Sequence, residues 1–239
     1  MQLSDFRVLS FDCYGTLIDW ETGIWNALQP MLENTGRTIT REQALADFAE
    51  IEPKVEHDHP DLLYRDLLGR VHAALAVHWQ LPAGQAQDNA FGRSIPDWPV
   101  FPDTTAALAY LKQHFRLVIL SNVDRQSFAA TNVKLGVTFD AICTAEDIGT
   151  YKPDHRNFQY LLSKVESLGH RKAELLHVAQ SPFHDLAPAE QLGISRCWIN
   201  RRAGQANTGG ATKVVKAMPK LDFQFQSLGA FADAHRSCH

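Results

Sequence analysis

The chain has 239 residues, with 23 Lys or Arg against 27 Asp or Glu and a formal net charge of -4. This length suits one large domain or one domain with a substantial insertion, and the charge balance gives no electrostatic basis for binding nucleic acid or an anionic membrane. The 4 cysteines lack CxxC spacing, and no stretch approaches the roughly 18 apolar residues of a membrane span, so we expect a cytoplasmic protein with a small-molecule partner.

Short apolar runs bounded by turn residues predict buried strands along the chain. They span residues 6–11, 116–120, 141–145, 175–180 and 196–200. Between the later runs lie helical patterns, for example in "DTTAALAYLKQHF", where apolar residues recur at helical spacing. Alternating strands and helices predict an α/β fold with a Rossmann-like parallel sheet core, in which ligands bind beyond the carboxyl ends of the strands.

The interval between the first and second predicted strands breaks this alternation. It contains no convincing strand, but helical stretches occur at residues 23–36, 40–56 and 63–79, separated by proline, glycine or polar clusters. We therefore predict an inserted all-helical cap.

The predicted domains are a core of residues 1–20 and 97–239 and a cap of residues 21–96. The segment "DWPVFPDT", with two prolines, would return the chain to the core.

Polar side chains follow the first four predicted strands on the side where a site is expected. Asp, Asn and Ser favour turns, so any one of these residues could be ordinary loop chemistry. Together, on one edge of one sheet, they indicate a functional site. They are Asp12, Ser121, Asn122, Asp124, Lys152, Ser181, His184 and Asp185.

The order of these motifs resembles that of the haloacid dehalogenase superfamily. The chain has "DCYGT" after the first strand, "LSN" at the second, "YKPD" before a helix, and Asp185 after the fourth strand. The resemblance covers essentially the whole chain and implies a haloacid dehalogenase-like core with its cap inserted after the first strand. "DCYGTL" together with "YKPD" is similar to the 2-haloacid dehalogenase branch.

The resemblance implies roles for five residues. Asp12 would be a carboxylate nucleophile, and Lys152 would keep it ionised and attract an anionic substrate. Thr16 and Ser121 would offer hydroxyl donors to a substrate oxyanion or to the acyl-enzyme carbonyl. Asp185 would orient or deprotonate the water that hydrolyses the intermediate.

Further residues are expected to contact the substrate or orient the site. Asn122 would orient a carboxylate or a loop, His184 lies beside Asp185, and several cap side chains could wall a small pocket. The full set is Tyr14, Trp20, Tyr64, Phe91, Arg93, Asn122 and His184.

Tyr14 bears on the leaving group. Superfamily members that cleave phosphate esters carry a second aspartate two positions after the nucleophile, and the ordinary pKa of tyrosine, near 10, makes it a poor general acid. A phosphatase also needs magnesium, and here His184 stands beside Asp185 in place of a pair of acids. A leaving group that needs no proton is favoured, with no metal and no cofactor. A magnesium-dependent phosphatase is the alternative.

Two such leaving groups remain open. The 2-haloacid dehalogenase resemblance implies that Asp12 displaces halide from the carbon next to a carboxylate, and that water then hydrolyses the resulting ester. Over nearly its full length the chain is also similar to the azetidine-2-carboxylate hydrolases of the same branch, in "NALQP", "WPVFPDT" and "LVILSNVDR". Their reaction opens a strained ring at a carbon–nitrogen bond, and that nitrogen is already protonated.

The chain departs from the dehalogenase pattern at three places. Phe158 stands where that branch has tyrosine, Pro182 stands where it has asparagine, and "ALADFAEIEP" has only acids where a halide-binding arginine would fall. A non-catalytic binding protein on the same fold is therefore a second alternative. The sequence is compatible with a homodimer.

Overall fold

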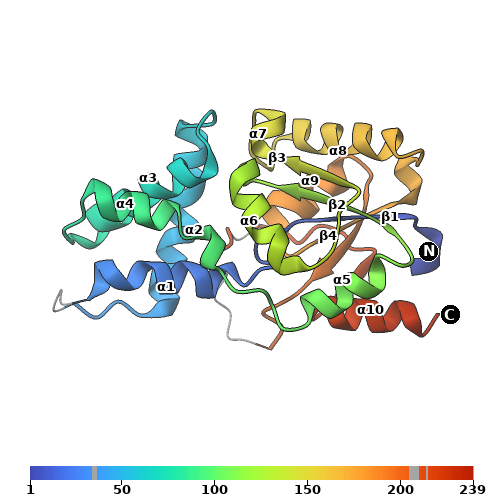
Figure 1. Cartoon of the computed structure of the whole chain (residues 1–239), viewed down its shortest axis with the longest axis horizontal. Coiled ribbons are helices and arrows are strands. Elements are labelled where there is room, and N and C mark those ends of the chain that lie inside the picture. Colours follow the sequence, from blue (N-terminus) through green and yellow to red (C-terminus); the bar gives the residue numbers. More distant parts are fainter. Residues whose placement is uncertain (34–36, 205–209, 214, 239) are drawn as a thin grey trace.

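The computed structural model describes residues 1–33, 37–204, 210–213 and 215–238. Within these residues one parallel sheet of six strands has the order β3-β2-β1-β4-β5-β6, and helices lie on both of its faces (Figure 1). The strands are β1 Val8–Phe11, β2 Arg116–Ser121, β3 Ala141–Thr144, β4 Leu175–Ala179, β5 Ser195–Ile199 and β6 Phe223–Phe225. The predicted α/β fold with a Rossmann-like parallel sheet is confirmed.

In the central strands β1 and β2, alternate residues pack against opposite layers of helices. On β1, Val8 joins a cluster with residues of α8 and α9, whereas Leu9 and Phe11 join the larger cluster on the other face, with residues of α5, α6 and α10. Because both faces are covered, the strands are apolar at nearly every position. These helices are α5 Thr104–Leu111, α6 Arg125–Leu135, α8 His155–Ser167, α9 Ala187–Gln191 and α10 Leu228–Arg236, and the short α7 Ala145–Ile148 precedes α8.

The chain between β1 and β2 is helical, as predicted, and lies to one side of the sheet in Figure 1. The first helix begins after Asp19, whose carboxylate accepts a hydrogen bond from the backbone N–H of Thr22 at 3.1 Å. Residues 34–36, at the end of the first predicted helix, lie outside the described residues. The fourth helix was not among the predicted stretches. The helices are α1 Trp20–Leu32, α2 Arg41–Asp58, α3 Tyr64–Trp79 and α4 Gln85–Gly92.

Helix α1 packs closely on the segment that leads back to the sheet. A Cβ atom on Gly23 would lie 2.2 Å from Cγ of Trp98, so only glycine allows this approach. Trp98 is buried directly after the short 3-10 helix Ile95–Asp97. This contact fixes the insertion against the return segment, close to the carboxyl end of β1.

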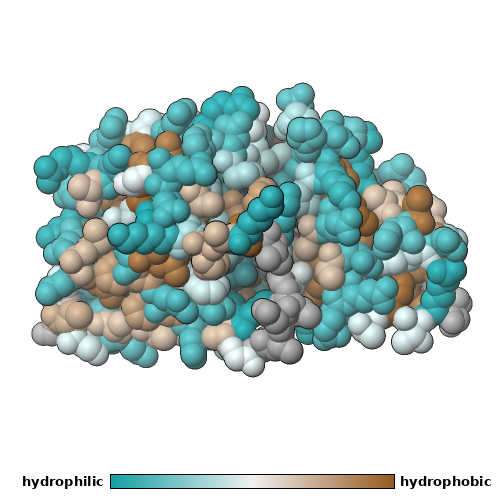
Figure 2. All heavy atoms as spheres, turned by 180° about the vertical axis from the view of Figure 1, so that it is seen from behind, coloured by the Kyte–Doolittle hydropathy of each residue, from teal (hydrophilic) through white to brown (hydrophobic). Residues whose placement is uncertain are grey.

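The molecular surface mixes residue types. Figure 2 shows, on the side opposite to that of Figure 1, hydrophilic side chains with apolar ones lying among them. In the described part of the chain, no helix combines the length and apolar character needed to cross a membrane.

Candidate active site

Three charged side chains meet beyond the carboxyl ends of the central strands. The Nζ atom of Lys152 donates hydrogen bonds to Oδ1 of Asp12 at 2.8 Å, to Oδ1 of Asp185 at 2.7 Å, and to the carbonyl oxygen of Leu120 at 3.2 Å. All three charged side chains are buried. Asp12 directly follows β1, which lies between β2 and β4, so the parallel register brings residues from distant parts of the chain together.

Burial and the shared ammonium group set the ionisation of this trio. Burial would lower the pKa of Lys152, but the two carboxylates outweigh it and raise that pKa. Burial raises the pKa of Asp12 despite Lys152. Burial would also raise the pKa of Asp185, but Lys152 and His177 outweigh burial and lower the pKa of that carboxyl group. The shared ammonium group therefore couples the ionisation of the two carboxylates.

Thr16 holds the nucleophile candidate in place. Its hydroxyl donates to Oδ2 of Asp12 at 2.7 Å and accepts from the backbone N–H of Gln180 at 2.9 Å. The hydroxyl hydrogen is therefore committed to Asp12 itself, whereas the sequence predicted that it would serve a substrate oxyanion or the acyl-enzyme carbonyl.

Asn122 orients the segment that carries Lys152. Its Oδ1 accepts from the backbone N–H of Lys152 at 2.6 Å, and its Nδ2 donates to the Lys152 carbonyl at 3.2 Å and to Oε1 of Glu56 at 3.2 Å. The predicted role of orienting a loop agrees with these contacts.

A small cavity, about 40 Å³, adjoins Asp12 and has room for only a few water molecules or a similarly small ligand. Most of the predicted site residues line it. The lining includes Asp12, Tyr14, Trp20, Glu52, Tyr64, Ser121, Asn122, Lys152, His184 and Asp185.

Tyr14 lines this cavity, but its hydroxyl group is engaged elsewhere. The Oη atom lies 2.8 Å from Oγ1 of Thr131, and the ring packs edge-on against Trp98 with centroids 5.5 Å apart. Burial raises the pKa of Tyr14 well above its ordinary value. The phenol therefore stays protonated at neutral pH and is a still weaker acid than free tyrosine.

Phe91 and Arg93 do not reach this cavity. Phe91 is buried against the ring of His72, with centroids 5.1 Å apart, and Arg93 lines a separate pocket with Arg65 and Asp88. The physical reason is that α4 packs on α3, which turns this end of the insertion away from Asp12. The predicted contact of Phe91 and Arg93 with substrate is therefore not supported by their positions.

His177, in β4, was missed from the sequence. It is fully buried; its Nε2 lies 3.0 Å from Oδ1 of Asp185 and its Nδ1 lies 2.8 Å from the hydroxyl of Ser10. The ring also packs edge-on against Phe158, with centroids 5.5 Å apart. The one available signal was a titratable residue inside the apolar run "LLHVA", since a buried polar group needs partners.

Glu52 was also missed. Its Oε1 accepts a hydrogen bond from the hydroxyl of Tyr64 at 2.7 Å, and burial, followed by the charge of Glu56, raises its pKa to about 8. Helix α2 thus brings one acidic side chain, Glu52, to the wall of the cavity.

The residues at the strand ends do not fit the magnesium site that the phosphatase alternative requires. Tyr14 replaces an acid and turns its hydroxyl to Thr131, and Oδ1 of Asp185 is already shared by Lys152 and His177. This edge of the sheet therefore offers too few free acidic oxygens for a hard divalent cation.

The parallel sheet with helices on both faces defines a protein of the α/β class, and a buried lysine joins two carboxylates at its strand ends. A family model described as "haloacid dehalogenase-like hydrolase" matches residues 6–193. The chain belongs to this family, and the predicted superfamily membership is confirmed.

The chain is also similar to individual haloacid dehalogenases, to some in sequence and to others in fold. The chain is 26% identical over 227 residues to an (S)-2-haloacid dehalogenase of Pseudomonas putida, which covers 92% of this chain and 96% of the relative. A solved L-2-haloacid dehalogenase of Xanthobacter autotrophicus superposes with a TM-score of 0.79 at 18% identity, covering 98% of this chain and 100% of that one. The same enzyme with chloropropionic acid covalently bound gives a TM-score of 0.78 at 18% identity, with the same coverage.

Proposed function

We propose that this hydrolase displaces a leaving group from the α carbon of a small carboxylic acid through an ester on Asp12. The observation that carries the proposal is the contact of one buried ammonium group, on Lys152, with both Asp12 and Asp185. The names of the relatives support it, since one similar structure has chloropropionic acid covalently bound.

In the first step, an Asp12 carboxylate oxygen attacks the α carbon, and the bond to the leaving group breaks with its electron pair on that group. Lys152 favours the ionised form of Asp12 and lowers the energy of an incoming carboxylate. The hydroxyl of Ser121, which lines the cavity, and backbone amides after Asp12 hold the substrate carboxylate.

In the second step, water attacks Cγ of the Asp12 ester. Oδ1 of Asp185 is held by Lys152 and His177, whereas its buried Oδ2 has no hydrogen-bond partner among the described residues. Oδ2 accepts the proton of the attacking water and passes it to the departing alkoxide, which becomes the 2-hydroxy acid. The carboxyl proton left on Asp12 is released, so the enzyme returns to its starting state.

The leaving group is one that departs without a proton from the enzyme. Halide meets this condition, and so does the protonated nitrogen of a strained ring such as that of azetidine-2-carboxylate. Tyr14 serves neither, because its hydroxyl contacts Thr131. Water is the only co-reactant, so the reaction needs no cofactor.

A side-by-side assay tests this function. Wild type and Asp12→Asn are incubated with 2-chloropropionate, azetidine-2-carboxylate and an aryl phosphate, with and without chelator. We expect the wild type to turn over at least one of the two carboxylates in the presence of chelator, and Asp12→Asn to turn over neither. Chelator-sensitive turnover of the aryl phosphate alone would contradict the proposal.

We also propose that residues 21–96 act as a cap over the core of residues 1–20 and 97–239. Two further proposals are that the protein works in the cytoplasm and that it forms a homodimer. The position of α1–α4 between β1 and β2 supports the cap assignment. Light scattering of the purified chain tests the homodimer.

A further inference from the structure

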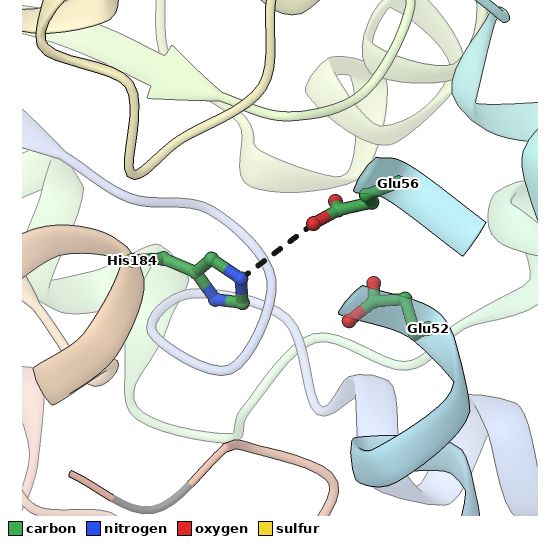
Figure 3. Close-up of side chains that lie close together, drawn as sticks. All are labelled: Glu52, Glu56 and His184. Atoms are coloured by element: carbon green, nitrogen blue, oxygen red, sulfur yellow. Dashed lines mark ion pairs between the residues drawn. The ribbon is translucent and has the colours of Figure 1, made fainter. Parts of the chain in front are cut away.

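Glu52, Glu56 and His184 form a cluster at the wall of the cavity, in which the two glutamates are buried and His184 is half-buried. Glu52 and Glu56 lie four residues apart on α2, so they share one face of that helix. His184 comes from the short π-helix Pro182–Leu186, which follows β4 in the sheet domain. One oxygen or nitrogen atom of each side chain lies within 4.8 Å of those of the other two, and Figure 3 shows the three converging.

Each of these side chains is oriented by its own polar neighbour. The hydroxyl of Tyr64 donates to Glu52 at 2.7 Å, and Nδ2 of Asn122 donates to Glu56 at 3.2 Å. The hydroxyl of Ser181 lies 3.3 Å from Nδ1 of His184, which directs the opposite ring nitrogen toward the glutamates. Metal-binding histidines and carboxylates are held by such outer hydrogen bonds.

The nitrogen that faces the glutamates lacks a hydrogen bond. Nε2 of His184 is shielded from solvent and has no hydrogen-bond partner in the described part of the chain. Oε2 of Glu56 lies 3.7 Å from this nitrogen, close enough for an ion pair with a protonated His184 (dashed line in Figure 3) but beyond hydrogen-bond range. A buried nitrogen left in this way is unusual, and a bond to a cation would satisfy it.

We propose that Glu52, Glu56 and His184 bind one first-row divalent cation, such as Zn²⁺ or Co²⁺. An imidazole and two carboxylates suit such ions, and three protein ligands leave a fourth position for water. Ligand atoms around tetrahedral Zn²⁺ are about 3.3 Å apart, given bonds of about 2.0–2.1 Å, so separations up to 4.8 Å close with small side-chain movements.

The proposed site joins two parts of the molecule. Two ligands belong to the helical insertion and one to the sheet domain, so a bound ion ties α2 to the turn that carries Asp185. The inference goes beyond the proposed reaction and does not depend on it, because the ion takes part in neither chemical step.

The site is tested without any substrate by titrating the untagged full chain with Co²⁺. The visible absorption of tetrahedral cobalt reports binding. The wild type is expected to bind one Co²⁺ per chain, and Zn²⁺ is expected to displace it. Tyr64→Phe removes only a partner that orients Glu52, so it should weaken Co²⁺ binding by roughly 10- to 100-fold. Glu56→Gln and His184→Gln each remove a ligand and should weaken Co²⁺ binding by more than this.

The matched control is Glu50→Gln, on the same helix, whose side chain is 71% exposed and pairs with Lys54. It should bind Co²⁺ as the wild type does. Thermal unfolding in chelator shows whether each variant is folded. Added Zn²⁺ should raise the Tm of the wild type and of Glu50→Gln, raise that of Tyr64→Phe less, and leave those of Glu56→Gln and His184→Gln nearly unchanged. Absence of the cobalt band in wild type, or binding unchanged in both Glu56→Gln and His184→Gln, would overturn the proposal.

Discussion

The ammonium nitrogen of Lys152 lies 2.8 Å from Oδ1 of Asp12, and both side chains are buried. Because Asp185 binds the same nitrogen at 2.7 Å, one cation serves two carboxylates with different tasks. Lys152 therefore connects the group proposed to attack the substrate with the group proposed to activate water.

Lys152→Ala is expected to abolish turnover and to reduce the free energy of unfolding by about 3–5 kcal/mol, because it leaves two buried carboxylates without their cation. Urea unfolding and steady-state kinetics measure the two effects. The control Lys54→Ala removes a lysine whose side chain is 65% exposed, and it should change neither quantity appreciably. A Lys152→Ala enzyme with wild-type turnover would refute the assigned role.

Tyr14→Phe should keep kcat within about fivefold of the wild type, whereas loss of a true general acid costs 10²–10⁴-fold. The reason is that the phenol contacts Thr131 and its pKa is raised by burial, so it supplies no proton to the leaving group. Stability should fall by about 1 kcal/mol from the lost hydrogen bond. A kcat reduced a hundredfold, with the fold intact, would show that Tyr14 takes part in proton transfer.

His177→Phe should slow hydrolysis of the Asp12 ester by about tenfold or more, since His177 holds one oxygen of the proposed base Asp185. Rapid quench and mass spectrometry of the intact protein should find more ester on Asp12 than in the wild type. Ser10→Ala is the matched control, because it removes the other partner of His177 and leaves the contact with Asp185. If His177 has only a structural role, both variants will lose stability and neither will accumulate ester.

Asp140→Asn tests the pH dependence of stability. Burial would raise the pKa of Asp140, but Lys112 at 2.5 Å and the backbone N–H of Leu117 at 2.8 Å outweigh it and lower that pKa. A lowered folded-state pKa stabilises the protein above the unfolded value, about 3.9, and this contribution is lost as pH falls through the folded value.

The substitution should therefore cost about 1 kcal/mol at pH 7, because Lys112 is partly solvated, and much less at pH values well below 3.9. Urea unfolding at both pH values measures the difference. Asp233→Asn, whose side chain is 71% exposed, is the control and should have little effect at either pH. An equal loss from Asp140→Asn at both pH values would contradict the assignment.

The buried strands could be predicted because both of their faces are covered, which makes them continuous apolar runs. Strand β6 was missed because Phe223–Phe225 has three residues and lies at the sheet edge, where neither phenylalanine is fully buried. In the helical insertion, the spacing of apolar residues predicted three of the helices. That spacing does not show how the helices pack against one another.

The same limit applies to the site. Asp12, Lys152 and Asp185 could be brought together from the sequence because the carboxyl ends of parallel strands share one edge. The sequence places His177 within a buried strand and so indicates only a core position. Its contact with Asp185 depends on the turn after β4. Phe91 was placed near the substrate because the sequence does not show which face of α4 packs on α3.

The central claim is that Asp12 forms the ester, and a single turnover in oxygen-18 water tests it most directly. With enzyme in excess over a carboxylate that it turns over, water attacks Cγ of Asp12, so mass spectrometry should find the label in the peptide that contains Asp12. The hydroxy acid from that first turnover should be unlabelled. Label in the hydroxy acid with none in Asp12 would mean that water attacks the substrate directly, and would contradict the covalent mechanism.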